Sequence, residues 1–233
     1  MIAKDIPLSL YVHWPWCVRK CPYCDFNSHA LTSCQNEATT AYMLALVADM
    51  KRSLTLVGDR PLQSIFIGGG TPSLIAPTAL EHFLNEVAKT YSLASDIEIT
   101  MQANPGTIDA EHFHAYRQAG VNRLSMGVQS FSDEKLLALG RIHNRSDAWK
   151  AIEIVHQNFD NFNLDVMYAL PSQTLPELIF DLTEALKAKS THLSFYQLTI
   201  EPNTVFAKKT PENLPDDDLC AQMQETVVST LEA

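Results

Sequence analysis

The sequence has few basic residues for its length. Seventeen Lys and Arg stand against 27 Asp and Glu, which gives a net charge of −10. A phosphate-binding surface needs clustered Lys and Arg, and the sequence contains no such cluster. A nucleic-acid partner is therefore not expected.

Long apolar runs are also missing. No stretch approaches the ~18 consecutive apolar residues of a membrane span, and Met1 to Pro7 hold no apolar signal region. These absences predict a cytoplasmic protein. There is no internal repeat and no low-complexity segment, and 233 residues with 46% hydrophobic content suffice for one substantial core.

Cysteine is scarce and unevenly placed. Three of the five cysteines, Cys17, Cys21 and Cys24, fall within eight positions, which is not the pattern of a disulfide framework. Thiolates spaced four and then three residues apart can surround one soft-metal centre. They cannot complete a four-sulfur shell, so an open coordination position is predicted.

Two other interpretations of these thiols stay open. They can be unrelated, or they can form a zinc knuckle whose fourth ligand is His13, His29 or Cys34. Cys34 is expected to be a bystander. Cys220 lies in a helical pattern and is expected to be packed in the interior.

A run of glycines follows the cysteines. The apolar segment 64–67 leads directly into Gly68, Gly69 and Gly70. Glycines at such a place let the backbone pass close to a ligand and turn its N–H groups toward it. A glycine run alone is a weak signal, but after the cysteine motif it predicts a ligand site.

Strand-like and helix-like segments alternate along the chain. This alternation implies right-handed βαβ crossovers and a parallel sheet, and an open flavodoxin-like sheet fits it as well as a barrel does. Strands are expected at 8–13, 64–67, 96–103, 122–129, 162–169 and 192–200, and helices at 37–53, 78–91, 109–119, 133–139, 147–158, 174–189 and from 216 onward. The segment 201–218 reads as a linker, which divides the chain into residues 1–200 and 201–233.

The cysteine motif and the following Gly-Gly-Gly-Thr-Pro-Ser together resemble the radical S-adenosylmethionine (SAM) superfamily, in its coproporphyrinogen oxidase-like branch. This branch includes an oxygen-independent coproporphyrinogen III dehydrogenase and the HemW-type haem chaperones. The resemblance implies an α/β fold, the (β/α)6 partial barrel with parallel strands and its ligand at their C-terminal ends. Members of the family extend well beyond 233 residues, so the chain is expected to be a fragment.

The resemblance also implies the cofactors. Cys17, Cys21 and Cys24 would bind three irons of a [4Fe-4S] cluster, and SAM would chelate the fourth through its amino and carboxylate groups. One electron from the cluster would then cleave SAM to methionine and a 5′-deoxyadenosyl radical.

Further motifs assign a SAM site by resemblance. Without these motifs, the aromatic residues of the site would be interpreted as packed side chains. The charged residues would be interpreted as surface ion pairs that contribute little to stability. The implied contacts are Tyr11 and Tyr23 beside the cluster and adenine, Gly69, Gly70 and Thr71 at the methionine amino group, Gln129 and Asp165 at the ribose hydroxyls, and Arg141 at the SAM carboxylate.

Two positions depart from patterns in the branch. Gln102 stands where the family usually has Glu, which removes a negative charge and should weaken an interaction with a cationic amino group. Phe26 stands where the dehydrogenase has a fourth cysteine, and Cys-Asp-Phe-Asn-Ser-His resembles the HemW type. The haem-associated His-Asn-x-x-Tyr-Trp motif is absent from these residues, and His143 is expected only as a neighbour of the SAM site.

The resemblance therefore implies a HemW-like haem chaperone that binds a [4Fe-4S] cluster, SAM and haem and delivers haem to an acceptor protein. The alternative is an oxygen-independent coproporphyrinogen III oxidase that decarboxylates propionates. A zinc-stabilised α/β module is a third reading. No catalytic residue is assigned, and the identity of the haem acceptor is left open.

Overall fold

The computed structural model describes residues 6–31, 36–107 and 110–232. Six parallel strands form one sheet in the order β1-β4-β5-β6-β7-β8, so strand order follows chain order. A flavodoxin-like sheet would have its first strand inside the sheet, whereas β1 lies at an edge here. The (β/α)6 partial barrel is confirmed. Its strands are β1 (Leu8–Trp14), β4 (Leu62–Gly69), β5 (Leu93–Ala103), β6 (Arg123–Gln129), β7 (Phe162–Tyr168) and β8 (His192–Gln197).

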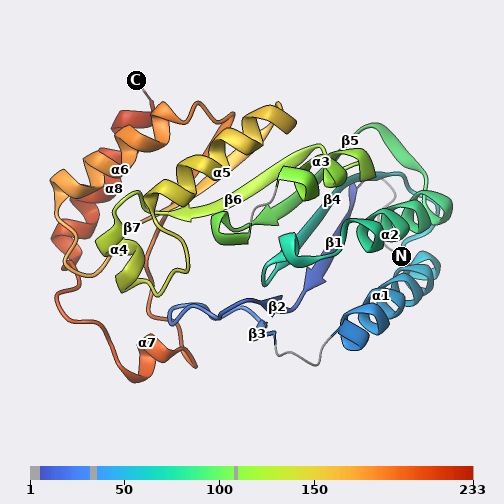
Figure 1. The fold of residues 1–233 in the computed structure, drawn as a ribbon, viewed down its shortest axis with the longest axis horizontal. Helices are drawn as coiled ribbons and strands as arrows, with labels where there is room; N and C mark the ends of the chain where they lie inside the picture. Colours follow the sequence, from blue (N-terminus) through green and yellow to red (C-terminus); the bar gives the residue numbers. More distant parts are fainter. Residues whose placement is uncertain (1–5, 32–35, 108–109, 233) are drawn as a thin grey trace.

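Most of the helices follow one another along the outer face of the sheet, whereas α4 and α7 lie apart from this row (Figure 1). Successive pairs pack together, α1 on α2, α2 on α3 and α3 on α5. Their bounds are α1 (Asn36–Val57), α2 (Pro77–Thr90), α3 (Ala110–Ala119), α4 (Asp133–Ala138), α5 (Arg145–Asn158), α6 (Leu175–Lys187), α7 (Val205–Lys208) and α8 (Asp217–Leu231). Two short 3₁₀ helices, η1 (Pro72–Leu74) and η2 (Pro105–Thr107), follow β4 and β5.

The core lies between the sheet and these helices. Ile65 and Ile67 of β4 are buried, and so are Leu80, Phe83 and Val87, which share one face of α2 at helical spacing. Burial of each such side chain contributes about 1.5–3 kcal/mol. The alternate residues of β4, Phe66 and Gly68, lie on the opposite, inner face of the sheet.

Most predicted elements are confirmed to within a few residues. The expected start of α6 is present, because the Thr174 N–H donates to Glu177 Oε2 at 2.7 Å. The start of α8 is also as expected, since Asp216 Oδ1 accepts from the Leu219 N–H at 2.9 Å. The sequence patterns missed α7 and the two-residue strands β2 (Trp16–Cys17) and β3 (His29–Ala30).

The segment after β8 packs on the rest of the chain. The Phe206 N–H at α7 donates to the Pro22 carbonyl at 3.0 Å. Helix α8 packs on α6, and Cys220 is buried there beside Met223, as expected for a packed thiol. The division of the chain at residue 200 stays a prediction.

Within the described residues, no helix combines the length and the apolar character that crossing a membrane would require.

Candidate functional site

A cavity of about 460 Å³ opens at the C-terminal ends of the strands. This is the end at which barrels of parallel strands place their ligands. The cavity brings together eleven of the twelve residues that the sequence singled out, and Tyr11 is the exception. Its lining includes Cys17, Cys21, Tyr23, Cys24, Gly69, Gly70, Thr71, Gln102, Gln129, Arg141 and Asp165.

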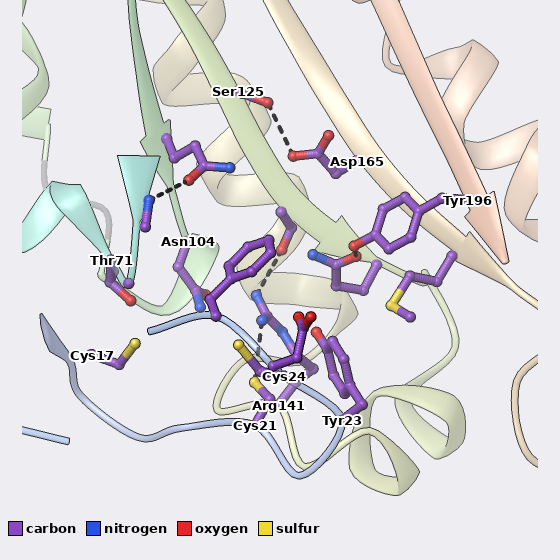
Figure 2. Close-up of a pocket in the computed structure, with 18 of the residues that line it drawn as sticks. Cys17, Cys21, Tyr23, Cys24, Thr71, Asn104, Ser125, Arg141, Asp165 and Tyr196 are labelled. Atoms are coloured by element: carbon purple, nitrogen blue, oxygen red, sulfur yellow. Dashed lines mark hydrogen bonds between the residues drawn. The ribbon is translucent and has the colours of Figure 1, made fainter. Parts of the chain in front are cut away.

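The three cysteine thiols face the same space, below Asp165 and Ser125 (Figure 2). They belong to the cysteine loop, residues 17–24, and all three are free. Cys17 is buried in the short strand β2, and the Cys24 N–H donates to the Cys21 carbonyl at 3.1 Å, which closes a turn between these two residues. Burial raises the pKa of the Cys24 thiol, against the opposing effect of hydrogen bonds from its surroundings.

His13 fixes the segment that follows the cysteine loop. Its Nε2 donates to the Asn27 carbonyl at 2.9 Å, and its Nδ1 accepts from the Tyr11 hydroxyl at 3.0 Å. Tyr11 is 57% exposed and its ring stacks near Phe66, outside the lining of the cavity. The predicted contact of Tyr11 with cluster and adenine stays a prediction.

The proposed zinc ligands do not gather in the part of the chain that the structure describes. No three His, Cys, Asp or Glu side chains there are placed to hold a single metal ion. His13 is engaged by Tyr11 and Asn27, and His29 is exposed on β3. Cys34 lies outside the described residues.

The glycine run carries a correction. The N–H groups of Gly70 and Thr71 donate to the carbonyls of Trp14 and Trp16 at 2.6 and 2.7 Å, and the Gly69 N–H donates to Gln102 Oε1 at 3.0 Å. The expectation that these N–H groups face a ligand is therefore wrong. The bonds of Gly70 and Thr71 continue the pairing of β4 with the segment that follows β1, and the bond of Gly69 joins β4 to a side chain of β5.

Glycine is required here because two backbone segments approach closely. A Cβ atom at Gly70 would lie 2.5 Å from the Trp16 carbonyl oxygen, and one at Gly69 would lie 2.7 Å from that of Trp14. Gly69 also has φ +113, a conformation that other residues rarely adopt. The glycines thus bring the end of β4 against the segment that carries Cys17.

Arg141 joins the cysteine loop to β6. Its guanidinium donates to Cys21 Sγ at 3.5 Å and to the Gly127 carbonyl at 2.7 Å, while its buried Nε has no hydrogen-bond partner among the described residues. The predicted contact with a SAM carboxylate stays a prediction. His143 is buried nearby, and its pKa is lowered to about 4 by burial and by Arg141, so its ring is neutral near pH 7.

Asp165 is held by a polar network on the inner face of the sheet. Ser125 Oγ donates to Asp165 Oδ2 at 3.0 Å, and Asn163 Nδ2 donates to Oδ1 at 2.8 Å. Burial raises the pKa of the Asp165 carboxyl, and these hydrogen bonds oppose the shift. A carboxylate oxygen accepts more than one hydrogen bond, so both oxygens can still accept from a ligand.

Gln129 occupies a turn at the end of β6. Its φ of 71 is uncommon for a residue other than glycine, and its Oε1 accepts a short hydrogen bond from the Tyr196 hydroxyl. Tyr196 was not identified from the sequence. The available signal was strand alternation, since Tyr196 lies opposite Met167 in register and both line the cavity.

A buried carboxylate supports the turn after Gln129. Asp181 of α6 accepts from the Phe131 N–H at 2.7 Å and from Ser130 Oγ at 2.8 Å. Sequence patterns could not identify this contact, because Asp181 lies in the middle of an amphipathic helix. Asp181 is fully buried, and burial raises the pKa of its carboxyl to about 6.

Most of the chain is similar to known proteins. The model of the Radical SAM superfamily matches residues 11–225. The chain is 52% identical over 220 residues to the heme chaperone HemW of Haemophilus influenzae and 51% identical over 218 residues to the heme chaperone HemW of Escherichia coli. Each alignment covers 93% of this chain and 57% of the relative, so the chain spans little more than half the length of these curated relatives.

A solved structure is also similar. The coproporphyrinogen III oxidase HemN from Escherichia coli, described as a radical SAM enzyme, matches with a TM-score of 0.87 and 26% sequence identity. The match covers 99% of this chain and 53% of that chain.

Proposed function

Because the chain belongs to the radical SAM superfamily, we propose that Cys17, Cys21 and Cys24 hold a [4Fe-4S] cluster and that the adjoining cavity binds SAM. The observation that carries this proposal is the placement of three free thiols on one wall of a cavity whose other walls combine polar and apolar side chains. The volume of about 460 Å³ lies within the range of small-molecule sites.

The residues of the cavity suit the parts of SAM. Each carboxylate oxygen of Asp165 already accepts one hydrogen bond within the protein. Both oxygens would accept a further bond from a ribose hydroxyl. Gln129 would donate through its amide nitrogen, because its oxygen is engaged by Tyr196. Tyr23 and Met167 supply apolar surface for an adenine ring.

The cysteine loop would exclude water from the cluster. Its Pro22 carbonyl is bonded by α7, and the rings of Tyr23 and Phe206 lie 6.4 Å apart. When bound, the cluster would supply the electron for reductive cleavage of SAM. The protein itself would hold the thiols in place, orient the ligand and exclude water from the site.

We further propose that the protein is a HemW-like haem chaperone, which binds haem and delivers it to an acceptor protein. Identities of 52% and 51% to proteins named heme chaperone HemW support this proposal. A cytoplasmic location is part of it, because free thiols persist in reducing compartments. No haem ligand is assigned to a residue of this chain.

A second candidate is an oxygen-independent coproporphyrinogen III oxidase, which the similarity to HemN favours. Phe26 argues against it. Its side chain lines the cavity and is 54% exposed, and an aromatic ring offers neither a thiol proton nor a soft metal ligand. The cavity would thus lack a group that the resemblance assigns to the dehydrogenase.

Anaerobic reconstitution with iron and sulfide tests the cluster and SAM. We expect a brown protein whose electron paramagnetic resonance spectrum, after reduction, changes when SAM is added. A colourless protein, or a spectrum that SAM does not alter, would contradict the proposal.

The same reconstituted protein separates the two candidate functions. With SAM and an electron donor, we expect no loss of mass from coproporphyrinogen III, whereas haem should bind to a version of the protein as long as the HemW relatives. Formation of protoporphyrinogen over multiple turnovers would favour the oxidase instead.

A further inference from the structure

Asn163 lies at the centre of a row of polar side chains on the inner face of the sheet. In strand register it is opposite Ser125 of β6 and His192 of β8. Asn163 and Asp165 are two residues apart on β7, so their side chains lie on the same face of the sheet. Asp165 lines the cavity, whereas Asn163 is 2% exposed and does not. Asn163 can therefore act on a ligand only through other residues.

Each hydrogen-bonding group of the Asn163 amide has a partner. Its Nδ2 donates to Ser125 Oγ at 2.9 Å and to Asp165 Oδ1 at 2.8 Å. Its Oδ1 accepts from the Ser194 hydroxyl at 3.0 Å and from His192 Nδ1 at 2.7 Å. An amide has two donor hydrogens and two acceptor lone pairs, so all four are used. An overturned amide would set its oxygen against the Asp165 carboxylate, which fixes the orientation of Asn163.

The direction of the hydrogen bonds continues through Ser125 to Asp165. Ser125 Oγ accepts from Asn163 Nδ2 and donates its single hydrogen to Asp165 Oδ2 at 3.0 Å (Figure 2). One oxygen of Asp165 thus accepts directly from Asn163, and the other accepts from a hydroxyl that Asn163 orients. Two such donors favour the ionised carboxylate. They also leave the remaining lone pairs of Asp165 for the cavity that it lines.

We propose that Asn163 is a positioning residue for the ligand site. It holds the Asp165 carboxylate in one orientation, with its remaining acceptor positions turned to the ribose hydroxyls of SAM. This inference rests on the proposed binding of SAM, and it adds a residue that acts on the ligand only through Asp165.

A first experiment needs no cofactor. The pKa of the Asp165 carboxyl is measured by carbon-13 nuclear magnetic resonance in the purified protein and in Asn163→Ala. Burial raises this pKa, and hydrogen bonds that include the one from Asn163 oppose the shift. Asn163→Ala should therefore raise the pKa of Asp165 further. An unchanged pKa would overturn the inference.

Other ionisable groups near Asp165 are present in both proteins. Arg123 of β6 lowers the pKa of Asp165. On β8, His192 contacts Asn163, and Tyr196 lies close enough for the charge of Asp165 to affect its hydroxyl. Burial raises the pKa of the Tyr196 hydroxyl, so this group is uncharged near neutral pH. A difference between the two proteins therefore reports the loss of the Asn163 amide.

A second experiment separates positioning from a general structural role. Dissociation constants of SAM and of its 2′,3′-dideoxy analogue are determined by equilibrium dialysis on the reconstituted protein. Asn163→Ala should weaken SAM about tenfold. The analogue lacks the hydroxyls from which Asp165 would accept, so its dissociation constant should not change. Equal weakening of both ligands would show a general structural effect and overturn the inference.

A double-mutant cycle tests whether Asn163 acts through Asp165. In the Asp165→Ala protein, adding Asn163→Ala should not weaken SAM further, because the carboxylate that Asn163 orients is already gone. A further tenfold loss would overturn the inference.

Two variants serve as checks on folding and on specificity. Asn163→Asp keeps the size of the side chain but sets an acceptor against Asp165, so it should also weaken SAM at least tenfold. It replaces Asn163→Ala if that variant does not fold, and unchanged SAM binding would overturn the inference. Asn85→Ala, at an exposed position of α2, should leave SAM binding unchanged. Failure of the parent protein to bind SAM would overturn the proposed function and this inference with it.

Discussion

The three thiols of the cysteine loop have different surroundings, yet the proposed cluster needs all of them. Cys17 is buried, while Cys21 and Cys24 are half-buried. Replacing any one of the three by Ala should abolish the brown chromophore after reconstitution, because two thiolates hold a four-iron cluster poorly. Absorbance and bound iron measure this. Cys220→Ala, which removes a buried thiol of α8 that does not line the cavity, should leave both unchanged, and loss of colour there would contradict the assignment.

Asp181 gives a residue-scale prediction about pH. Its carboxyl has a pKa of about 6 in the folded protein against an ordinary value of 3.8, because burial outweighs the bonds from Ser130 and Phe131. Glu177 also raises this pKa, and Lys135 lowers it. Since the folded state holds the proton more tightly, the contribution of Asp181 to the free energy of unfolding is greatest below pH 3.8 and is lost as the pH rises through about 6.

Asp181→Asn removes this titration. The free energy of unfolding of the parent protein minus that of the variant should fall by about 3 kcal/mol between acidic and neutral pH. Urea unfolding at several pH values measures the difference. A difference that stays constant across this range would show that Asp181 is not the buried acid described here. The exposed Asp160→Asn provides the matched control.

Sequence reasoning predicted the residues that belong to motifs and missed those that depend on packing. The cysteines, Asp165 and Gln129 follow from motif order, and the structure places them on one cavity. Tyr196 was missed because its hydroxyl meets Gln129 only through the pairing of distant strands. The direction of the Gly69 N–H could not be predicted either, since it depends on how closely β4 approaches β5.

At the scale of elements, the junction between β4 and η1 depends on glycine for two reasons. Gly69→Ala would strain a backbone with φ +113 and place a methyl group 2.7 Å from the Trp14 carbonyl and the His13 ring. We expect a loss of about 3 kcal/mol in the free energy of unfolding. Gly58→Ala has a positive φ of 72 but nothing within 4 Å, so it should cost only about 1 kcal/mol. Equal losses in denaturant unfolding would argue against the close contact.

The length of a helix or strand determined whether the sequence could predict it. The periodicity of α2 and the apolar run of β4 span enough residues to identify their type. Strands β2 and β3 have two residues each and α7 has four, too few for a period to appear. These short elements exist because of long-range hydrogen bonds, such as that from Phe206 to Pro22.

At the scale of the whole molecule, the cavity joins both halves of the chain. Gln102 comes from β5 and Tyr196 from β8, so a bound ligand would bridge distant strands. SAM at 100 times its dissociation constant should therefore raise the free energy of unfolding of the reconstituted protein by about 2.7 kcal/mol. Asp165→Asn should need about ten times more SAM for the same gain. Thermal unfolding measures the gain in stability of each protein. If both gained equally at the same SAM concentration, Asp165 would not belong to the SAM site.

The strand order also governs how the molecule can be assembled during translation. Each strand after β1 pairs with the strand made just before it in the main sheet, so a nascent strand finds its partner already synthesised. Parallel pairing is slow when both partners must first search for each other across long loops. Growth from one edge limits that search to a single crossover at a time. The contact of Phe206 with Pro22 can form only after all six strands of the main sheet have been made, so the cysteine loop stays uncovered by α7 until then.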